Sequence, residues 1–290
     1  IPDARFNKIR RTVLPELQIF MKKPYKIGLA LSGGGARGIA HIGVLQALRE
    51  NNIEVEAISG TSAGSIVAAM YAAGKDPREM LEFASANSSI FRMYQFGISR
   101  IGFTSLNNLK TKMLEYLDED SFEHLKIPCH IVATNLQTGE VDTFTEGSLL
   151  DSVTASSSIP IVFKPIEING FMYVDGGLLM NLPAEPLYAT CEKVIGVNVM
   201  PFARTAADKI TNVLDIATRV FDLAVVASSA NQVLLCDYVI EPMKICSFTT
   251  YNFTKYEELY QVGYDATVAI MDELKEKLSQ PTPFDSSLLA

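Results

Sequence analysis

The sequence predicts an α/β fold: a single domain with a mainly parallel central sheet flanked by helices. Two stretches, 26–50 and 55–73, share one order of elements, which is a short apolar strand, a glycine-rich turn and a helix. This alternation is typical of parallel sheets, because each helix returns the chain to the edge at which the next strand begins. The chain has 290 residues, of which 48% are hydrophobic, and no repeat or break in composition divides it.

The first of these units begins with the apolar strand Lys26–Ser32 and ends with the helix Ile39–Glu50. The glycines between them match the dinucleotide fingerprint G-x-G-x-x-G, which needs an acidic residue at the end of the second strand. Glu54 and Glu56 instead stand at the start of that strand. We therefore favour an oxyanion hole, in which consecutive backbone N–H groups at a helix N-terminus stabilise a developing negative charge. The residues assigned to it are Gly33, Gly34, Gly35, Ala36, Arg37 and Gly38.

The second unit contains the motif G-x-S-x-G. The strand Val55–Ser59 runs into Gly60-Thr61-Ser62-Ala63-Gly64, and the helix Ser65–Ala73 follows. Between a strand and a helix this motif forms a nucleophile elbow, in which the glycines allow a sharp turn that exposes the serine hydroxyl. The alternative is a glycine-rich turn in which Ser62 only caps the helix.

The later elements follow from apolar periodicity and from turn signals. We expect an Asn169-Gly170 hairpin, because this dipeptide favours the tight turn between two strands. The expected helices are Asp76–Ala86, Leu106–Leu117, Leu149–Ser158, one or two within 206–233, and an amphipathic terminal helix, Lys255–Leu278. The expected strands are Cys129–Thr134, Glu140–Phe144, Ile161–Ile168, Phe171–Val174, Lys193–Val199 and Tyr238–Ile240.

A serine nucleophile needs a general base, and the sequence offers two kinds. The histidines are His41, His124 and His130, and none follows residue 130, where a hydrolase with the order Ser, acid, His would need one. Asp175 stands at the end of another predicted strand and is followed by Gly176-Gly177. Asp175 is the favoured base, whereas an unusual triad that uses His124 or His130 stays open.

These motifs together resemble the patatin-like phospholipase family, in particular its small bacterial members. The resemblance covers about residues 25–200 and includes Ala155-Ser156, Ile159-Pro160 and Phe163-Lys164-Pro165 before Asp175, and Asn181-Leu182-Pro183 after it. It implies a patatin-like α/β/α sandwich and a serine–aspartate dyad without a catalytic histidine. Ser62 would be the nucleophile, Asp175 the base, Gly60 and Gly64 the glycines of the elbow, and the loop at Gly33–Gly38 the oxyanion hole.

The resemblance implies a lipid acyl hydrolase of the phospholipase A or esterase type, with a lipid or acyl-ester substrate and no metal or cofactor. Ser62 would attack an ester carbonyl and form an acyl-enzyme that water cleaves. An acyltransferase or thioesterase would use the same dyad, and a non-catalytic lipid-binding module is a third possibility. The oligomeric state stays open.

Charge and composition limit the partners and the compartment. The net charge of −8 argues against general binding of nucleic acid. The cysteines show no metal-ligand spacing and read as reduced thiols, and no run of about eighteen apolar residues is present, which together favour a cytoplasmic location. Contact with a membrane surface stays open.

Three regions complete the predicted organisation. Residues 1–24 form a basic N-terminal arm, which packs on the domain or lies on a membrane surface. Residues 25–200 form the catalytic core, and 201–290 form a C-terminal helical part of the same domain. The aromatic segment Ile90–Phe103 is either a connector buried in the core or an apolar lip over the site.

Overall fold

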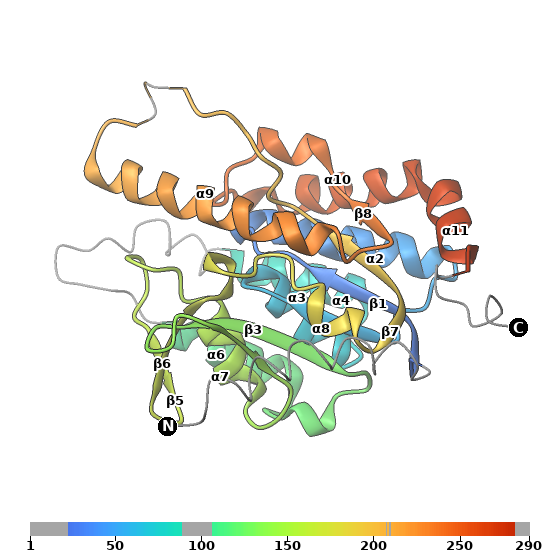
Figure 1. The fold of residues 1–290 in the computed structure, drawn as a ribbon, viewed down its shortest axis with the longest axis horizontal. Helices are drawn as coiled ribbons and strands as arrows, with labels where there is room; N and C mark the ends of the chain where they lie inside the picture. Colours follow the sequence, from blue (N-terminus) through green and yellow to red (C-terminus); the bar gives the residue numbers. More distant parts are fainter. Residues whose placement is uncertain (1–22, 89–105, 207, 209, 282–290) are drawn as a thin grey trace, which may run out of the picture.

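A central sheet of eight strands organises the molecule (Figure 1). The computed structural model describes residues 23–88, 106–206, 208 and 210–281. The expectations for the arm at 1–22 and for the segment Ile90–Phe103 fall outside these residues. The strand order is β5-β6-β3-β2-β1-β7-β8, and β4 pairs with β3 off this path.

The sheet is parallel at its centre and antiparallel at one end. The neighbours β1–β2, β1–β7, β2–β3 and β7–β8 are parallel, whereas β3–β4, β3–β6 and β5–β6 are antiparallel. This confirms a mainly parallel central sheet within a single α/β domain. The strands are β1 (Tyr25–Leu31), β2 (Ala57–Gly60), β3 (Cys129–Asn135), β4 (Val141–Phe144), β5 (Ile166–Ile168), β6 (Phe171–Asp175), β7 (Cys191–Val197) and β8 (Tyr238–Ile240).

Helices surround this sheet, and local signals define their ends. Asp76 caps α4 in a capping box with Glu79, and Pro77 occupies the first turn, where its missing N–H costs nothing. The α-helices are α2 (Ala40–Glu50), α3 (Ala63–Ala72), α4 (Pro77–Ala86), α6 (Asn107–Leu117), α7 (Leu149–Ser156), α8 (Glu185–Tyr188), α9 (Val213–Val233), α10 (Tyr256–Ala269) and α11 (Met271–Ser279). Short 3₁₀ helices are η1 (Gly35–Ile39), η3 (Phe122–His124), η4 (Gly176–Leu178), η6 (Met243–Ser247) and η7 (Phe253–Lys255).

The two faces of the central strands carry side chains of different size. On β1, Leu29 and Leu31 enter the larger core, which α2, α3, α4, α6, α7 and α10 share. Ala30 faces a smaller core that contains α8 and the turn after α9. A side chain at Gly28 would lie 2.6 Å from Cys191 Sγ. Small residues on this face therefore let α8 pack close to the sheet.

Two strands meet end to end along one edge of β3. The last residue of β2, Gly60, is opposite Ile131, and the last residue of β6, Asp175, is opposite Ala133. β4 pairs with residues 131–134 and so occupies the other edge. Because β6 runs antiparallel to β3 and β2 runs parallel to it, the carboxyl ends of β2 and β6 point at each other.

Two predicted elements are wrong in their extent. The strand predicted for Ile161–Ile168 is limited to Ile166–Ile168, because residues 159–163 turn away from the sheet and Ile161 has a left-handed φ of 74°. The terminal helix predicted for Lys255–Leu278 is two helices that meet at Ile270. The break directs Met271 and Leu274 of α11 into the larger core. The division of the chain at residues 24 and 200 stays a prediction.

Within the described ranges, none of the helices combines the length and the apolar character that crossing a membrane requires.

Helices α2 and α10 touch through their backbones. A side chain at Gly43 of α2 would overlap the carbonyl oxygen of Tyr260, and one at Gly263 of α10 would overlap that of Ala40. The two glycines thus bring the helix axes closer than larger side chains would allow. Leu259 of α10 is fully buried at the same contact.

We predict that Gly263→Ala destabilises the protein although alanine favours helices. The propensity gain is about 1 kcal/mol. The new methyl group would meet rigid backbone rather than a flexible side chain. The clash should outweigh the propensity gain, so that the free energy of unfolding falls by about 3 kcal/mol in total. Urea denaturation measures the change. The control Val268→Ala, at an exposed position of α10, should shift stability by less than about 0.5 kcal/mol; equal stability of the two variants would show that the helices separate freely.

Candidate active site

Ser62 occupies a sharp turn between β2 and α3. Its backbone has φ 51° and ψ −122°, a conformation that residues with a side chain rarely adopt and that surrounding contacts must enforce. A side chain at Gly60 would lie 2.5 Å from the carbonyl oxygen of Gly64, and one at Gly64 would overlap that of Leu31. Both glycines are therefore required for the turn to close against β1.

The side chains of Ser62 and Asp175 meet where β2 and β6 end. The Ser62 hydroxyl lies close enough to the Asp175 carboxyl group to lower its pKa, and both residues line the same pocket. Asp175 Oδ1 accepts the N–H of Gly177 at 2.7 Å. Both residues are buried. Burial raises the pKa of Asp175 from 3.8 to about 7, and the nearby Ser62 hydroxyl and Gly177 N–H oppose that shift only in part.

The end of α7 holds the backbones of both residues. Ser156 Oγ accepts the N–H of Ser62 at 2.8 Å, and the carbonyl oxygen of Ser158 accepts the N–H of Asp175 at 2.9 Å. Ser156 and Ser158 are fully buried. Ser156 is part of the family resemblance in the sequence, but the resemblance assigned it no role. Its role depends on a contact between distant segments, which no local pattern shows.

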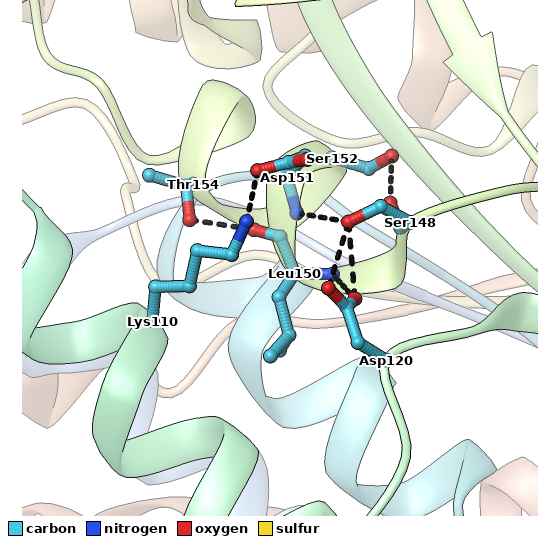
Figure 2. Close-up of polar contacts among 7 residues, drawn as sticks. All are labelled: Lys110, Asp120, Ser148, Leu150, Asp151, Ser152 and Thr154. Atoms are coloured by element: carbon cyan, nitrogen blue, oxygen red, sulfur yellow. Dashed lines mark hydrogen bonds and ion pairs between the residues drawn. The ribbon is translucent and has the colours of Figure 1, made fainter.

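The other end of α7 is anchored by a polar network (Figure 2). Ser148 Oγ accepts the N–H of Asp151 at 3.0 Å and donates to the carboxylate of Asp120. Asp120 Oδ1 also accepts the N–H of Leu150 at 2.7 Å, and Lys110 of α6 forms an ion pair with Asp151. These bonds satisfy two of the free N–H groups at the start of the helix and fix α7, which presents Ser156 to Ser62.

The glycine-rich loop lies against the elbow. A side chain at Gly33 would lie 3.1 Å from Ser62 Cβ, and one at Gly38 would lie 2.5 Å from Ala63 Cβ. The N–H of Gly33 donates to Asn181 O and that of Ala36 to Thr250 O, while that of Arg37 bonds back to Gly34 O. Among the described residues, no acceptor faces the N–H groups of Gly34 and Gly35.

The predicted residues Ala36 and Arg37 stand apart from the rest of the loop. Gly33, Gly34, Gly35 and Gly38 line the same pocket as Ser62 and Asp175, whereas Ala36 is buried beneath it. The Arg37 guanidinium donates to the carbonyl oxygen of Phe248 through Nε at 3.0 Å and Nη2 at 2.7 Å. Burial lowers the pKa of Arg37. Arg37 therefore ties the loop to the segment at Phe248–Thr250.

The three histidines lie away from Ser62. His41 is fully buried in α2, where Nε2 contacts Ser32 O at 2.8 Å and burial lowers its pKa to about 4. His130 is on β3, and burial lowers its pKa as well. His124 is exposed beside Glu119. Among the described residues that line the pocket there is no histidine.

The pocket at Ser62 is large and mostly apolar. It encloses about 1470 Å³, counting its open mouth. Its walls come from α2, α3, α4, α6, α9 and the turn at 159–163; the apolar lining includes Ile42, Val67, Met70, Phe83, Leu109, Val162, Phe221 and Val225. Asp175 and Asp222 are the charged side chains of the described lining.

The mainly parallel sheet makes this an α/β protein, in which a serine on a strained elbow, an aspartate at the facing strand end and a glycine-rich loop meet at one place. The sequence profile of the patatin-like phospholipase family matches residues 29–188, more than half of the chain. The protein belongs to the patatin-like phospholipase family.

Relatives match different shares of the chain. An uncharacterised NTE family protein of Mycobacterium tuberculosis is 36% identical over 167 residues, which cover 56% of this chain and 45% of the relative. The lysophospholipase NTE1 of Saccharomyces cerevisiae is 30% identical over 272 residues, which cover 82% of this chain and 16% of that protein. This chain thus spans less than half of either relative.

A solved structure shares the fold. VipD from Legionella pneumophila matches 86% of this chain and 67% of its own with a TM-score of 0.50 and 19% sequence identity. This likeness supports the patatin-like α/β architecture that the sequence predicts.

We predict that Asp175→Asn stabilises the protein at pH 8. The folded pKa of about 7 lies above the unfolded value near 3.8, so the protonated carboxyl group stabilises the fold below about pH 4. That contribution is lost as the pH rises through 7, by up to about 4 kcal/mol. Asparagine stays neutral and can still accept from Gly177.

Urea denaturation at pH 4 and pH 8 measures this effect. The free energy of unfolding of Asp175→Asn should exceed that of the parent at pH 8 and equal it near pH 4. Asp265→Asn, an exposed control on α10, should have the stability of the parent at both pH values. Curves for parent and Asp175→Asn that run parallel from pH 4 to pH 8 would contradict a raised pKa.

Proposed function

We propose that this protein is a serine lipid acyl hydrolase of the phospholipase A or esterase type. The observation that carries the proposal is that Ser62, on its strained elbow, and the buried carboxyl group of Asp175 line one pocket where two strands end against each other. A base with a pKa near 7 is suited to accept a proton at neutral pH and to return it. Ser62 is the proposed nucleophile and Asp175 the proposed base.

The proposed reaction has two halves. Ser62 Oγ attacks the ester carbonyl while its proton passes to Asp175, and the collapse of the tetrahedral intermediate releases the alcohol, which takes that proton. Water then attacks the acyl-enzyme and gives a proton to Asp175; the acid leaves as Ser62 recovers the proton. Asp175 accepts and releases one proton in each half, so it is back in its starting state after one turnover.

The oxyanion is proposed to bind at the glycine-rich loop. The N–H groups of Gly34 and Gly35 are the proposed donors, because those of Gly33, Ala36 and Arg37 already have backbone acceptors. Both glycines line the pocket beside Ser62. Loss of one such donor typically costs about 10²–10³ in rate.

The lipid substrate is proposed from the pocket and from the relatives. A pocket with a mostly apolar lining accommodates an acyl chain better than a small polar ester. The name of the yeast relative describes a lysophospholipase. Acyl transfer or thioester hydrolysis would use the same dyad, and product analysis in the presence of an added alcohol or lysolipid acceptor separates these reactions from ester hydrolysis.

A serine-directed phosphonate should label Ser62 and abolish turnover of a soluble short-chain ester. The expected adduct follows from the elbow, which presents the hydroxyl beside its base. Mass spectrometry of peptides maps the label. Ser62→Ala should lose both labelling and turnover, whereas Ser279→Ala, at an exposed position of α11, is the control and should keep both. An adduct elsewhere, or labelling of Ser62→Ala, would overturn the assignment.

The histidines should be dispensable for the chemistry. His124→Ala and His130→Ala should keep kcat/KM for the soluble ester within a few-fold, and His41→Gln should keep measurable turnover, because no described histidine lines the pocket. Asp175→Asn should lose about 10²–10⁴-fold in kcat/KM, the range of a missing general base. A folded histidine variant as inactive as Ser62→Ala would replace the dyad with a triad.

A further inference from the structure

The outer face of α9 is unusually apolar for a surface helix. Four of its large apolar side chains are exposed: Val213, Ile216, Val220 and Leu223. The exposed fractions reach 82% at Val213 and 61% at Val220. At about 100° per residue the four positions fall within about 80° of one another around the helix. They form one stripe, which we call the α9 stripe.

The opposite face of α9 forms a wall of the pocket. Ala217, Phe221 and Val225 line the same pocket as Ser62, and Val225 is buried. Asp215 and Arg219 lie between these two faces of the helix, and Asp222 lines the pocket. The helix therefore separates the pocket from an exposed apolar surface.

The apolar surface extends beyond the stripe. Phe202 and Ile210, in the connection that leads into α9, are exposed as well. The guanidinium of Arg219 lies 5.9 Å from the ring centre of Phe202 and donates to Ala203 O at 3.1 Å. These contacts hold Phe202 beside the N-terminal half of the helix. Figure 1 shows this half of α9 (orange) reaching past the sheet.

The pocket itself opens beside another exposed apolar side chain. Ile161 lines the pocket, is 57% exposed and has a left-handed φ of 74°. A β-branched residue with this φ is strained, and such strain is concentrated at functional sites. Exposed apolar side chains are thus present on α9 and at Ile161, and both α9 and Ile161 contribute to the pocket lining.

Charge decides which surface fits the stripe. The chain carries a net charge of −8, and α9 contains two acidic residues and one basic residue. An anionic membrane would repel such a protein, whereas an electrically neutral lipid surface would not. A helix with one apolar face lies in such an interface with that face among the headgroups and acyl chains.

We propose that the α9 stripe docks the protein on an electrically neutral lipid surface and so places the mouth of the pocket where acyl esters can enter. The substrate part of this inference rests on the proposed hydrolase function. The docking itself depends only on the exposed stripe and can be measured without catalysis.

The test is co-sedimentation of the full chain with phosphatidylcholine vesicles. The parent protein should bind, and Val213→Asp combined with Val220→Asp should lower the partition coefficient at least tenfold. An aspartate at residue 213 stands in the first turn of α9, where negative charge is favourable, so the fold should persist. The matched control combines Leu234→Asp with Val268→Asp, which adds the same charge at positions 81% and 44% exposed, and should stay within twofold of the parent.

Catalytic readouts separate the two proposals. Both double variants should hydrolyse a soluble short-chain ester like the parent, and only the α9 variant should lose turnover on vesicles. Ser62→Ala should bind vesicles normally; vesicle binding by a parent that cleaves no ester would refute the proposed function and leave docking intact. A parent that does not bind vesicles, an α9 variant that binds like the parent, or a parent dimer that the α9 substitutions dissociate would overturn the docking proposal.

Discussion

The site depends on one constraint of the sheet: two strands end against each other along a single edge of β3. β2 arrives parallel to β3 and β6 arrives antiparallel to it, and their last residues, Gly60 and Asp175, pair with Ile131 and Ala133. Neither strand can extend without colliding with the other. The chain must turn out of the sheet at both ends, and the two turns carry Ser62 and Asp175 to the same point.

The C-terminal end of α7 then holds Ser62 and Asp175 rigidly in place. Ser156 holds the N–H of Ser62 and Ser158 holds that of Asp175, so a displacement of α7 would move both residues together. This explains why the N-terminus of α7 is fixed so thoroughly by Asp120 and Ser148, far along the helix from the site. Rigid support matters because catalytic groups lose much of their effect when displaced by about 1 Å.

Burial gives the site its acid–base properties at a cost in stability. A carboxyl group removed from water, with the Ser62 hydroxyl and the Gly177 N–H opposing the shift only in part, has its pKa raised to about 7, which makes it a stronger base than an exposed aspartate. The ionised form is correspondingly unfavourable in the fold. The apolar pocket that accounts for this burial is also the feature from which an acyl-chain substrate is proposed, so the proposed substrate and the raised pKa have one physical origin. The face of α9 that points away from the pocket is also apolar and is exposed at the surface.

Much of this protein is determined by local sequence. Strand, glycine turn and helix could be read from residues 26–50 and 55–73, because apolar runs and glycines act over a few residues, and the end of a strand at Asp175 was visible for the same reason. The extent of the strand before Asn169 could not be predicted, since residues 159–163 are drawn from the sheet to line the pocket. Nor could the sequence show that Gly33 and Ala36 use their N–H groups internally, because the acceptors Asn181 and Thr250 are far along the chain. The sequence thus determined which residues can do the chemistry, and only the tertiary structure decided which of them meet, because register between strands and contacts between distant segments are properties of the packed chain.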